Sequence, residues 1–303
     1  MTRTEFGKIQ FVGKTKIFTV LSLVMILASL AFLFSKGLKY GIDFAGGTEA
    51  QIQFSSKVNN VNDLRGLLEG TSLADAQVVA FGDLNEYLVR FQNDESTSAK
   101  EQNEAIEKRI KELRTTLESK AAGAYEIRRV DSVGPQVGAQ LKRNGLLAIF
   151  YSLLLILIYV GLRFDYEYAP GAVVCLFHDA IITLGIFALI EHEVNVSILA
   201  AVLTIIGYSL NDTIINFDRI RENRERHKGA SMSDIVNLSI NQVLSRTILT
   251  SVTTLMAVGA LYMFAGGVIT DFAFVLGIGI IIGTYSSIYV AAPLVLVFQN
   301  FRK

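Results

Sequence analysis

A lone carboxylate stands in one of the most apolar stretches of the chain. Asp212 follows the nearly uncharged run 196–210 and lies shortly before Arg219, where a dense basic segment starts. A helix rises about 1.5 Å per residue, so Asp212 is roughly 10 Å inside that basic boundary. A carboxylate at the centre of a bilayer costs about 2.5 to 3.5 kcal/mol on insertion scales, and it should therefore face protein or water rather than lipid. The chemistry open to it is the reversible binding of a proton.

Asp212 belongs to a polar stripe on its helix. Thr204, Tyr208, Asp212 and Asn216 recur every four residues, so they lie along one face. Asn211 stands directly beside the carboxylate and adds a second polar group at the same depth.

The basic group best placed to act on Asp212 is Arg246, at the start of the next apolar run. If the two helices are antiparallel neighbours, their cytoplasmic ends bring both residues to similar depth. A nearby guanidinium favours the ionised carboxylate and burial favours the neutral one, so an arginine that moves would change the proton affinity of Asp212. That arrangement is the physical basis of a proton-coupled switch. The alternative is a static ion pair that only holds two helices together.

His178 and Asp179 form a second polar pair, adjacent in the otherwise apolar run 171–190. They could take part in a proton pathway, or they could make a packed hydrogen bond between helices. Both roles remain open at this point. The candidates for proton coupling are thus Asp212, Arg246, Asn211, Asp179 and His178.

Other patterns argue against an enzyme or a metalloprotein. The three histidines lack the HExxH and H-x3-5-H spacings of zinc sites. The single cysteine, Cys175, excludes an internal disulfide and any multi-cysteine metal site, and its apolar run indicates a small buried side chain. The glycine-rich segment 41–48 is neither a GxGxxG turn before a helix nor a Walker A sequence, so nucleotide binding is not expected. We expect no catalytic residues, no metal and no cofactor.

The composition is that of a membrane protein. Of 303 residues, 51% are hydrophobic and only 18% are charged. Lys plus Arg and Asp plus Glu both number 28, so no basic excess points to a nucleic-acid partner. The charges are distributed unevenly along the chain, and their distribution sets the topology.

Six apolar runs are long enough to cross a bilayer, which takes about 20 residues of helix. They cover 17–34, 145–162, 171–190, 196–217, 247–266 and 272–297. The first run continues beyond the Ser29-x-Ala31 sequence that resembles a cleavage site, so we expect a retained helix rather than a signal peptide. Gly279, Gly283 and Ser287 in the last run should let helices approach closely.

Basic residues orient these spans by the positive-inside rule. The N-terminal lysines, the basic cluster after the fourth span and the last two residues are all expected in the cytoplasm, whereas the loop 191–195 has no Lys or Arg and is expected to be solvated outside. The predicted divisions are 1–34 with the first helix, 35–144 as an extracytoplasmic domain, and 145–303 with the other helices and a basic cytoplasmic loop 218–246. Within that loop, 231–245 is predicted to be an amphipathic helix near the membrane surface.

The segment 35–144 has the composition of a soluble domain. Alternation predicts a strand at 48–54, with Ala50, Ile52 and Phe54 on one face. The further predicted elements are a helix at 61–68, a hairpin of strands at 76–81 and 87–91, a charged helix at 98–121 and a strand at 125–130. The order β-α-β-β-α-β is that of a ferredoxin-like module. The predicted fold class is therefore an α-helical membrane protein with six transmembrane helices and one α+β ferredoxin-like extracytoplasmic domain.

Five motifs, taken together and in order, resemble the SecF type of the SecD/SecF family of protein-export membrane proteins. They are GIDFAGGT at 41–48, SVGPQVG at 132–138, HD at 178–179, GYSLNDTIINFDRIREN at 207–223 and LSRT at 244–247. The match covers essentially the whole chain. It implies a six-helix unit of the resistance-nodulation-division type in the bacterial cytoplasmic (inner) membrane, with one extracytoplasmic domain and both termini cytoplasmic.

The resemblance also implies a function and partners. Family members act with SecD, which supplies a second six-helix half, and with the SecYEG channel and YajC. They use the proton motive force, or sodium in some members, to help draw a translocating preprotein outward across the lipid bilayer after the ATP-driven step. Asp212 resembles the family's proton-carrying aspartate and Arg246 its essential arginine. Moving one charge through 100 mV is worth about 2.3 kcal/mol, which is enough to bias a domain motion.

Three other functions fit part of this pattern. A half-transporter for a small molecule would share the fold, but larger extracytoplasmic loops with an apolar pocket would be expected. An intramembrane protease would use paired aspartates, yet neither Asp179 nor Asp212 lies in a GxGD sequence. A passive scaffold would leave Asp212 dispensable, whereas the coupling hypothesis predicts that Asp212→Asn abolishes gradient-driven export and leaves assembly intact.

Overall fold

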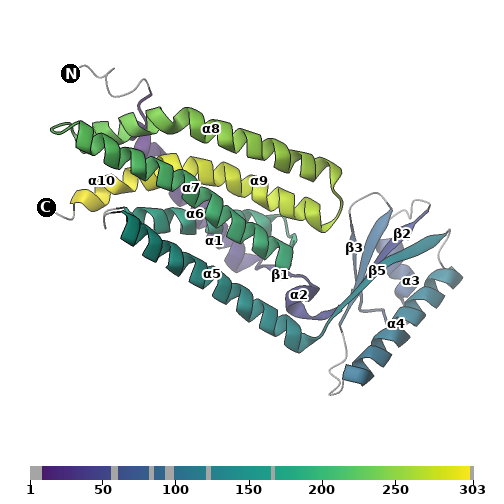
Figure 1. Ribbon diagram of the computed structural model, residues 1–303. Coiled ribbons are helices and arrows are strands. Elements are labelled where there is room, and N and C mark those ends of the chain that lie inside the picture. Colours follow the sequence, from purple (N-terminus) through teal and green to yellow (C-terminus); the bar gives the residue numbers. More distant parts are fainter. Residues whose placement is uncertain are drawn as a thin grey trace. The chain divides into compact units, whose positions relative to one another are not determined.

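The computed structural model describes residues 9–55, 61–81, 85–92, 99–120, 124–164 and 168–300. The chain divides into two compact units: a helical unit, Met1–Lys39 with Leu147–Lys303, and a smaller unit, Tyr40–Leu146. The helical unit contains long apolar helices, and the smaller unit contains a four-stranded sheet (Figure 1).

Six long apolar helical stretches are candidates to cross a membrane by length and composition. They are α1 (Thr15–Ser35), preceded by the short turn η2 (Val12–Lys14), α5 (Pro135–Arg163), α6 (Ala169–Leu189), α7 (Val196–Arg226), α8 (Met232–Phe264) and α9 (Val268–Ser286), which continues through η3 (Ser287–Ala291) into α10 (Ala292–Asn300). The two-residue strands β1 (Lys39–Tyr40) and β6 (Glu193–Val194) lie between helices in the chain. The six helices predicted from the apolar runs are confirmed.

The close approach of α9 to α7 and of α6 to α1 depends on glycine. A Cβ atom at Gly279 would lie 2.2 Å from Ile205 Cδ1, within the space that the Ile205 side chain fills. A Cβ at Gly185 would lie 2.2 Å from Ser29 Cβ. The prediction that Gly279 lets helices approach closely is confirmed, and Gly185 is a further contact of the same kind.

The segment predicted as a cytoplasmic loop, 218–246, is mostly helical. α7 continues through Arg226 and α8 begins at Met232, so only 227–231 connect the two helices. Ser231 marks the start of α8, because its hydroxyl oxygen accepts a hydrogen bond from Asp234 N.

The helix predicted at 231–245 is confirmed, but it does not end before the next span, since this segment is the first half of α8. No glycine or proline stands between Ser231 and Thr247 to end a helix. The apolar residues of the segment are also buried within the unit rather than spread along a surface; Val236 and Ile240, for example, are both 0% exposed.

The last span contains a stretch of π-helix, η3, that the sequence analysis did not predict. Pro293 lies just beyond it. Proline has no N–H to donate, and its ring clashes with the carbonyl four residues earlier, at Tyr289. A π-helical turn relieves this conflict, and such turns are frequent at functional sites.

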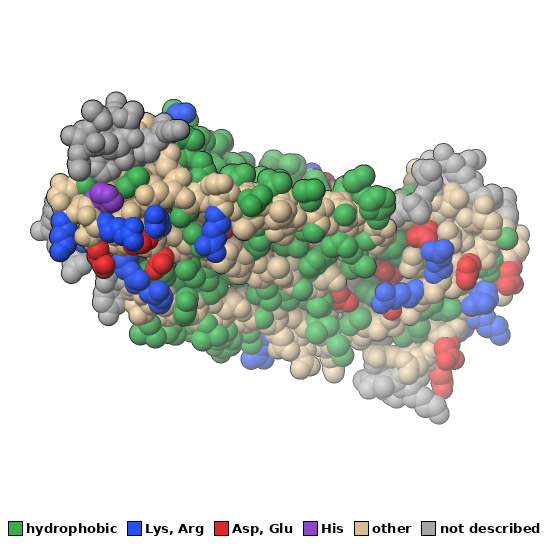
Figure 2. Space-filling view, turned by 45° about the horizontal axis from the view of Figure 1, so that its top comes forward, with side chains coloured by type: hydrophobic (Ala, Val, Ile, Leu, Met, Phe, Trp, Pro, Cys, Tyr) green, Lys and Arg blue, Asp and Glu red, His purple; other side chains and the backbone are tan. Residues whose placement is uncertain are grey.

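The helical unit presents a largely apolar flank (Figure 2). Its most exposed large side chains are Phe34 of α1, Leu162 of α5, and Met256, Met263 and Phe264 of α8. Lys and Arg gather at the end of the unit where α7 finishes (Figure 2). An apolar flank with charge confined to the ends suits a bilayer.

The smaller unit is an antiparallel sheet with two helices. Its strands are β2 (Gly47–Phe54), β3 (Gln77–Ala80), β4 (Glu86–Phe91) and β5 (Tyr125–Val133), in the spatial order β3-β4-β2-β5. In the chain, α3 (Val61–Leu68) follows β2 and α4 (Ala99–Lys120) follows β4. The strands and helices predicted for this region are confirmed to within a few residues.

One face of this sheet holds the core. Ala50, Ile52 and Phe54 of β2 are buried, as the alternation predicted. They pack in one cluster with Leu64 of α3 and Leu113 of α4, so both helices cover the same face.

The two glycine-bearing motifs of the smaller unit fold against each other, where the short helix α2 (Ile42–Ala45) meets β2. Gly46 has a φ of 75°, a conformation that residues with a side chain rarely adopt. A Cβ at Gly46 would lie 3.0 Å from Pro135 Cα, and one at Gly138 would lie 3.1 Å from Gly46 N. Glycine in 41–48 and 132–138 thus serves the close approach of two backbone segments.

Candidate functional site

Asp212 lies inside the helical unit on α7, with only 1% of its surface exposed. Its Oδ2 atom is buried and makes no hydrogen bond to any residue in the described ranges. A buried carboxylate without partners is costly in its charged form. Asp212 can therefore gain or lose a proton without breaking an existing hydrogen bond at Oδ2.

Arg246 lies on α8, near enough to Asp212 for the two charges to interact. The two side chains form no ion pair within the part of the chain that the structure describes, and Asp212 Oδ2 stays unpartnered. The Arg246 side chain is instead exposed on the surface of the unit. The closed ion pair weighed as an alternative is thus not the arrangement in this structure.

Two hydrogen bonds fix the alignment of the antiparallel helices α7 and α8. Tyr208 Oη donates to Thr254 Oγ1 (3.3 Å), and Asn223 Nδ2 donates to Ser239 Oγ (2.8 Å). The two contacts are equally far apart along both helices. Residue 246 is consequently level with residue 216, one helical turn from Asp212 toward the basic end.

The predicted polar stripe on α7 is buried only in part. Asp212 and Asn216 face the interior, whereas Thr204 is exposed and its hydroxyl donates to Ala200 O in its own helix (2.8 Å). Asn211 is also exposed. The structure therefore does not bring the Asn211 side chain into the buried cluster around Asp212.

Asn216 and Thr247 are two further buried polar side chains near the level of Asp212. Asn216 is 1% exposed, and its Nδ2 donates to the carbonyl of Ser287 in η3 (3.1 Å). Thr247 of α8 is also 1% exposed. Like Asp212 Oδ2, the Asn216 Oδ1 and Thr247 Oγ1 atoms have no hydrogen-bond partner among the described residues.

The other threonines of α8 bond to their own helix. Thr250, Thr253 and Thr254 each donate a hydroxyl proton to a carbonyl about one turn back, at 2.9 to 3.0 Å. These hydroxyls are thus bonded to the backbone and are not available as ligands.

Asp179 on α6 is the centre of a closed hydrogen-bond network. Its Oδ2 atom accepts hydrogen bonds from Ser209 Oγ of α7 (2.5 Å) and Ser286 Oγ of α9 (2.8 Å). His178 Nδ1 lies 2.9 Å from its Oδ1 atom, and the Cys175 thiol donates to Ser286 Oγ (3.1 Å). The carboxylate, which is 0% exposed, thus joins three helices. Cys175 is buried, as predicted.

His178 connects this network to α1. Its ring stacks on Tyr285 of α9, with centroids 6.0 Å apart, and its Nε2 atom is buried without a partner in the described part of the chain. The Tyr285 hydroxyl lies 2.8 Å from Ser22 Oγ and donates to Phe18 O (2.9 Å). The interhelical hydrogen bonds considered for the His178–Asp179 pair are therefore present, made by Asp179.

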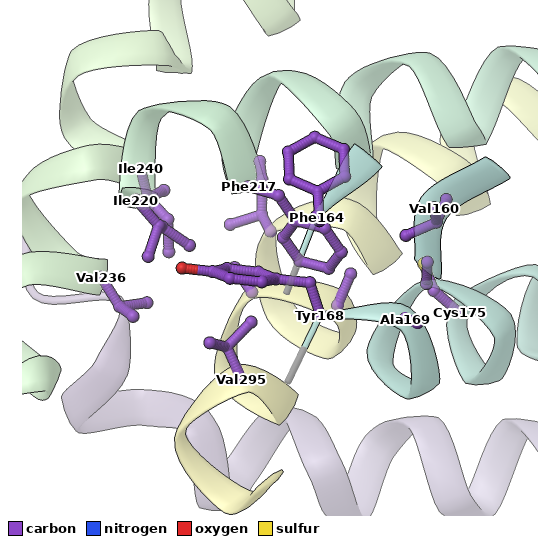
Figure 3. Close-up of a cluster of buried hydrophobic side chains, with 14 of the residues drawn as sticks. Val160, Phe164, Tyr168, Ala169, Cys175, Phe217, Ile220, Val236, Ile240 and Val295 are labelled. Carbon is purple, nitrogen blue, oxygen red and sulfur yellow. The ribbon is translucent and has the colours of Figure 1, made fainter. Parts of the chain in front are cut away.

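On its basic side the site is closed by buried apolar side chains. The rings of Phe164, Tyr168 and Phe217 lie against one another, with centroids 5.1 to 6.1 Å apart. Val236 and Val295 flank the Tyr168 ring (Figure 3). A close-packed apolar layer excludes water, so this cluster separates Asp212 from the basic end of the unit.

Both carboxylates are evident in the sequence, but the residues that distinguish them are not. Ser209 and Thr247 lie within the motifs at 207–223 and 244–247, and Ser286 lies beside Ser287, but no local pattern shows which of these hydroxyls bonds to a carboxylate. The available signal for the π-helical turn beside Asn216 was Pro293, late in the predicted last span.

The loop at 191–195, predicted to be solvated, is exposed at Glu191 and His192, which both make charged contacts, whereas Val194 is buried. Glu191 accepts hydrogen bonds from Lys36 Nζ and Lys39 Nζ, both at 2.8 Å, and these bonds lower the pKa of Glu191 to about 2. His192 Nδ1 lies 3.0 Å from Asp271 Oδ1. Among the described residues there is no group of three or more His, Cys, Asp or Glu that could hold a metal ion.

Comparisons with known proteins all lead to one protein family. Residues 112–301 match the family model for the C-terminal part of the protein export membrane proteins SecD/SecF, and residues 31–58 match the SecD/SecF GG motif. The chain is 42% identical to the protein translocase subunit SecF of Calditerrivibrio nitroreducens, over 98% of this chain and 96% of that protein. It is 45% identical to the subunit of the same name from Vibrio alginolyticus, over 95% and 89%.

A solved structure is similar as well. The crystal structure of SecDF from Thermus thermophilus, described as a translocon-associated membrane protein, matches with a TM-score of 0.85 at 35% identity. The match covers 97% of this chain and 39% of that one. This chain thus spans nearly the whole length of the SecF relatives but only about two fifths of SecDF.

Proposed function

The chain belongs to the SecD/SecF family of protein-export membrane proteins, and we propose that it couples the proton motive force to protein export. It would act with SecD as a subunit of the Sec machinery, assisting preprotein translocation across the cytoplasmic membrane after the ATP-driven step. Its relatives are named translocase subunits, which describes a transport component rather than an enzyme.

The observation that best supports this proposal is the environment of the Asp212 carboxylate. It is buried in a helix long and apolar enough to cross a membrane, its Oδ2 atom has no partner in the described ranges, and an exposed cationic side chain, Arg246, lies nearby. A group with these properties can change its charge in response to a proton gradient. The change alters its attraction to Arg246 and hence the preferred position of α8 relative to α7.

Protons would reach Asp212 from the outer side. The apolar cluster around Tyr168 and Phe217 supports this direction, since it closes the route from the basic, cytoplasmic end. Protonation then weakens the interaction with Arg246, α8 shifts, and the extracytoplasmic unit changes orientation. Each charge moved through 100 mV supplies about 2.3 kcal/mol for this motion.

The remaining candidates take supporting roles in this scheme. Asp179 and His178 would hold α6, α7 and α9 as a fixed frame, because Asp179 already accepts hydrogen bonds from Ser209 and Ser286. Asn211 would act from the exposed side of α7, where a partner half can contact it.

The proposed partners are SecD, the SecYEG channel, YajC and the translocating preprotein. A second half is consistent with SecDF, in which the matched region is about two fifths of a longer chain. We further propose that both termini are cytoplasmic, in the inner membrane, and that the smaller unit is a ferredoxin-like extracytoplasmic domain. The strand order β3-β4-β2-β5, with both helices on one face, supports that assignment.

The test is translocation of a reporter preprotein into vesicles that carry this chain with its partner. Wild type and Asp212→Asn are compared with and without a proton gradient, and complex assembly is checked by co-purification. We expect gradient-driven stimulation only in the wild type, with equal assembly. Equal stimulation in both proteins would refute the coupling role and favour a passive scaffold.

A further inference from the structure

Three oxygen atoms near the junction of α7, α8 and η3 are buried and have no hydrogen-bond partner among the residues that the structure describes. They are Asp212 Oδ2, Asn216 Oδ1 and Thr247 Oγ1, and each of the three residues is 1% exposed. Buried polar atoms are nearly always bonded to protein or to a bound molecule. Three unpartnered oxygens at one junction therefore point to a ligand.

Two of these residues share one face of α7. Asn216 follows Asp212 by four residues, a spacing that places the two side chains one above the other. The Asn216 amide is oriented by its bond from Nδ2 to Ser287 O (3.1 Å) in η3. Its NH2 group is thus committed to η3, and its oxygen remains available as a ligand.

Thr247 reaches the same junction from α8. It is buried although both of its neighbours in the sequence are exposed, so its side chain faces the interior. One turn away, Ser251 Oγ lies 2.7 Å from Thr284 Oγ1 of α9. Because α8 and α9 are antiparallel, Thr247 is level with the first turn of η3, where Asn216 binds the Ser287 carbonyl.

The chemistry of the three oxygen atoms indicates which ligand they would bind. Carboxylate, amide and hydroxyl oxygens are hard ligands, which suit small cations that have no preference for nitrogen or sulfur. Asp212 supplies one negative charge, which matches a monovalent ion. Membrane helices interrupted beside such oxygens are a recurring setting for cation sites, and η3 is an interruption of this kind.

We propose that Asp212, Asn216 and Thr247 form one binding site for a small monovalent cation, either Na⁺ or hydronium. Asn216 and Thr247 are its neutral ligands and set its affinity. This inference rests on the coupling role proposed for Asp212 and extends it from one carboxylate to a site of three residues. Among the described residues, the charge that acts on Asp212 is that of Arg246 on α8. Other titratable side chains on the elements packed against the site include Tyr208 of α7, Cys175, His178 and Asp179 of α6, Tyr285 of α9 and Tyr289 of η3.

The experiment measures stimulated export in vesicles that hold the full chain with its partner. One series varies NaCl against choline chloride at fixed pH, and the other varies pH without sodium. Asn216→Leu and Thr247→Val each remove one ligand oxygen at similar volume. We expect each variant to raise the half-saturating cation concentration about 10-fold or more, with maximal stimulation retained. The series in which the shift occurs identifies the cation.

Matched variants separate ligand loss from altered packing. Thr247→Ser keeps the oxygen and should retain the wild-type half-saturating concentration. Thr253→Val makes the same substitution as Thr247→Val in the same helix, but the Thr253 hydroxyl already donates to Leu249 O (2.9 Å), so no shift is expected. A shift as large in Thr253→Val as in Thr247→Val would overturn the site.

A second measurement does not depend on export. The purified complex is heated in NaCl and in choline chloride, and at several pH values, because a bound cation raises the unfolding temperature. The cation-dependent part of that temperature should be lost in Asn216→Leu, Thr247→Val and Asp212→Asn. If the first two variants keep both the wild-type half-saturating concentration and the cation-dependent stabilisation, the three-residue site is refuted. If wild-type export responds to no gradient, the proposed function fails, and the thermal measurement still decides the site.

Discussion

Asp179 and Asp212 are two carboxylates on neighbouring helices, 0% and 1% exposed, that differ in their hydrogen bonding. Asp179 accepts hydrogen bonds from Ser209 and Ser286 and lies against His178. Asp212 Oδ2 has no partner within the described ranges. Burial is therefore the same at the two positions, and hydrogen bonding is not.

This difference in hydrogen bonding indicates different roles for the two carboxylates. Any change in the charge of Asp179 would disturb bonds that join α6, α7 and α9, which also approach closely through glycines such as Gly279. A change at Asp212 disturbs no bond to Oδ2 and acts on Arg246, an exposed residue of α8. We infer that a buried carboxylate suits reversible charge chemistry when it is left unpartnered, and suits helix packing when it is saturated.

The largest effect is expected from Arg246→Ala, which removes the cation that responds to Asp212. Gradient-driven stimulation of export should fall to the level of Asp212→Asn, because a charge change at Asp212 then has no cation to move. Assembly with the partner should be unchanged, since within the described ranges no ion pair joins Arg246 to Asp212 whose loss would disturb the packing of α7 and α8. The measurement is vesicle translocation with and without a gradient.

Arg221→Ala is the matched control for Arg246→Ala. Arg221 lies in the basic cluster after the span and pairs with Asp218 (3.0 Å), so its loss should leave stimulation intact. Stimulation that survives in Arg246→Ala, or is lost equally in Arg221→Ala, would break the proposed link between Asp212 and Arg246.

The position of Asp212 could be predicted from the sequence, but its chemical state could not. A lone carboxylate is easily recognised in an apolar run. The six helices and the alternation of buried residues in β2 follow from hydropathy and periodicity. The saturation of Asp179 depends on Ser286, more than a hundred residues away in the chain, and on the packing of three helices. Such long-range contacts leave no local pattern. The continuity of the predicted helix at 231–245 with the next span was not predicted for a related reason, because it depends on the tertiary burial of residues such as Val236 and Ile240.

Asp179→Ala should be the most destabilising of the carboxylate substitutions. It removes the hydrogen-bond acceptor of the buried Ser209 hydroxyl and the partner of His178 Nδ1, while the Ser286 hydroxyl retains Gly283 O (3.0 Å), and we expect a loss of about 2 to 4 kcal/mol in the free energy of unfolding. The measurement is reversible unfolding of the purified protein in detergent micelles. A loss below about 0.5 kcal/mol, the range of ordinary surface substitutions, would mean that Asp179 is not a structural centre.

Asp212→Leu should change the free energy of unfolding in the opposite direction. Replacing an unpartnered buried carboxylate by an apolar side chain of similar size removes a desolvation penalty, so in choline chloride without sodium the free energy of unfolding should rise by about 1 kcal/mol. Export stimulation should nevertheless be lost. The same micelle unfolding assay compares this variant with Asp179→Leu, which carries the same new side chain. Equal destabilisation by both substitutions would remove the distinction between the two sites.

Glu191→Gln should have the smallest effect, and that effect should depend on pH. Like Asp179, Glu191 has partners for both carboxylate oxygens, here Lys36 and Lys39. It is exposed to water, however, where ion pairs contribute little to stability. Its pKa is lowered from 4.5 to about 2 in the folded protein, so its contribution to stability is present above about pH 4.5 and is lost as the pH falls from 4.5 toward 2. The wild type should therefore unfold at a slightly higher temperature than Glu191→Gln at pH 7, and the two should converge only below about pH 2. A difference that persists or grows at low pH would show that the two lysines do not stabilise the ionised form. Convergence, with only a small difference at pH 7, would show that the hydrogen bonds of an exposed carboxylate contribute much less than those of the buried Asp179.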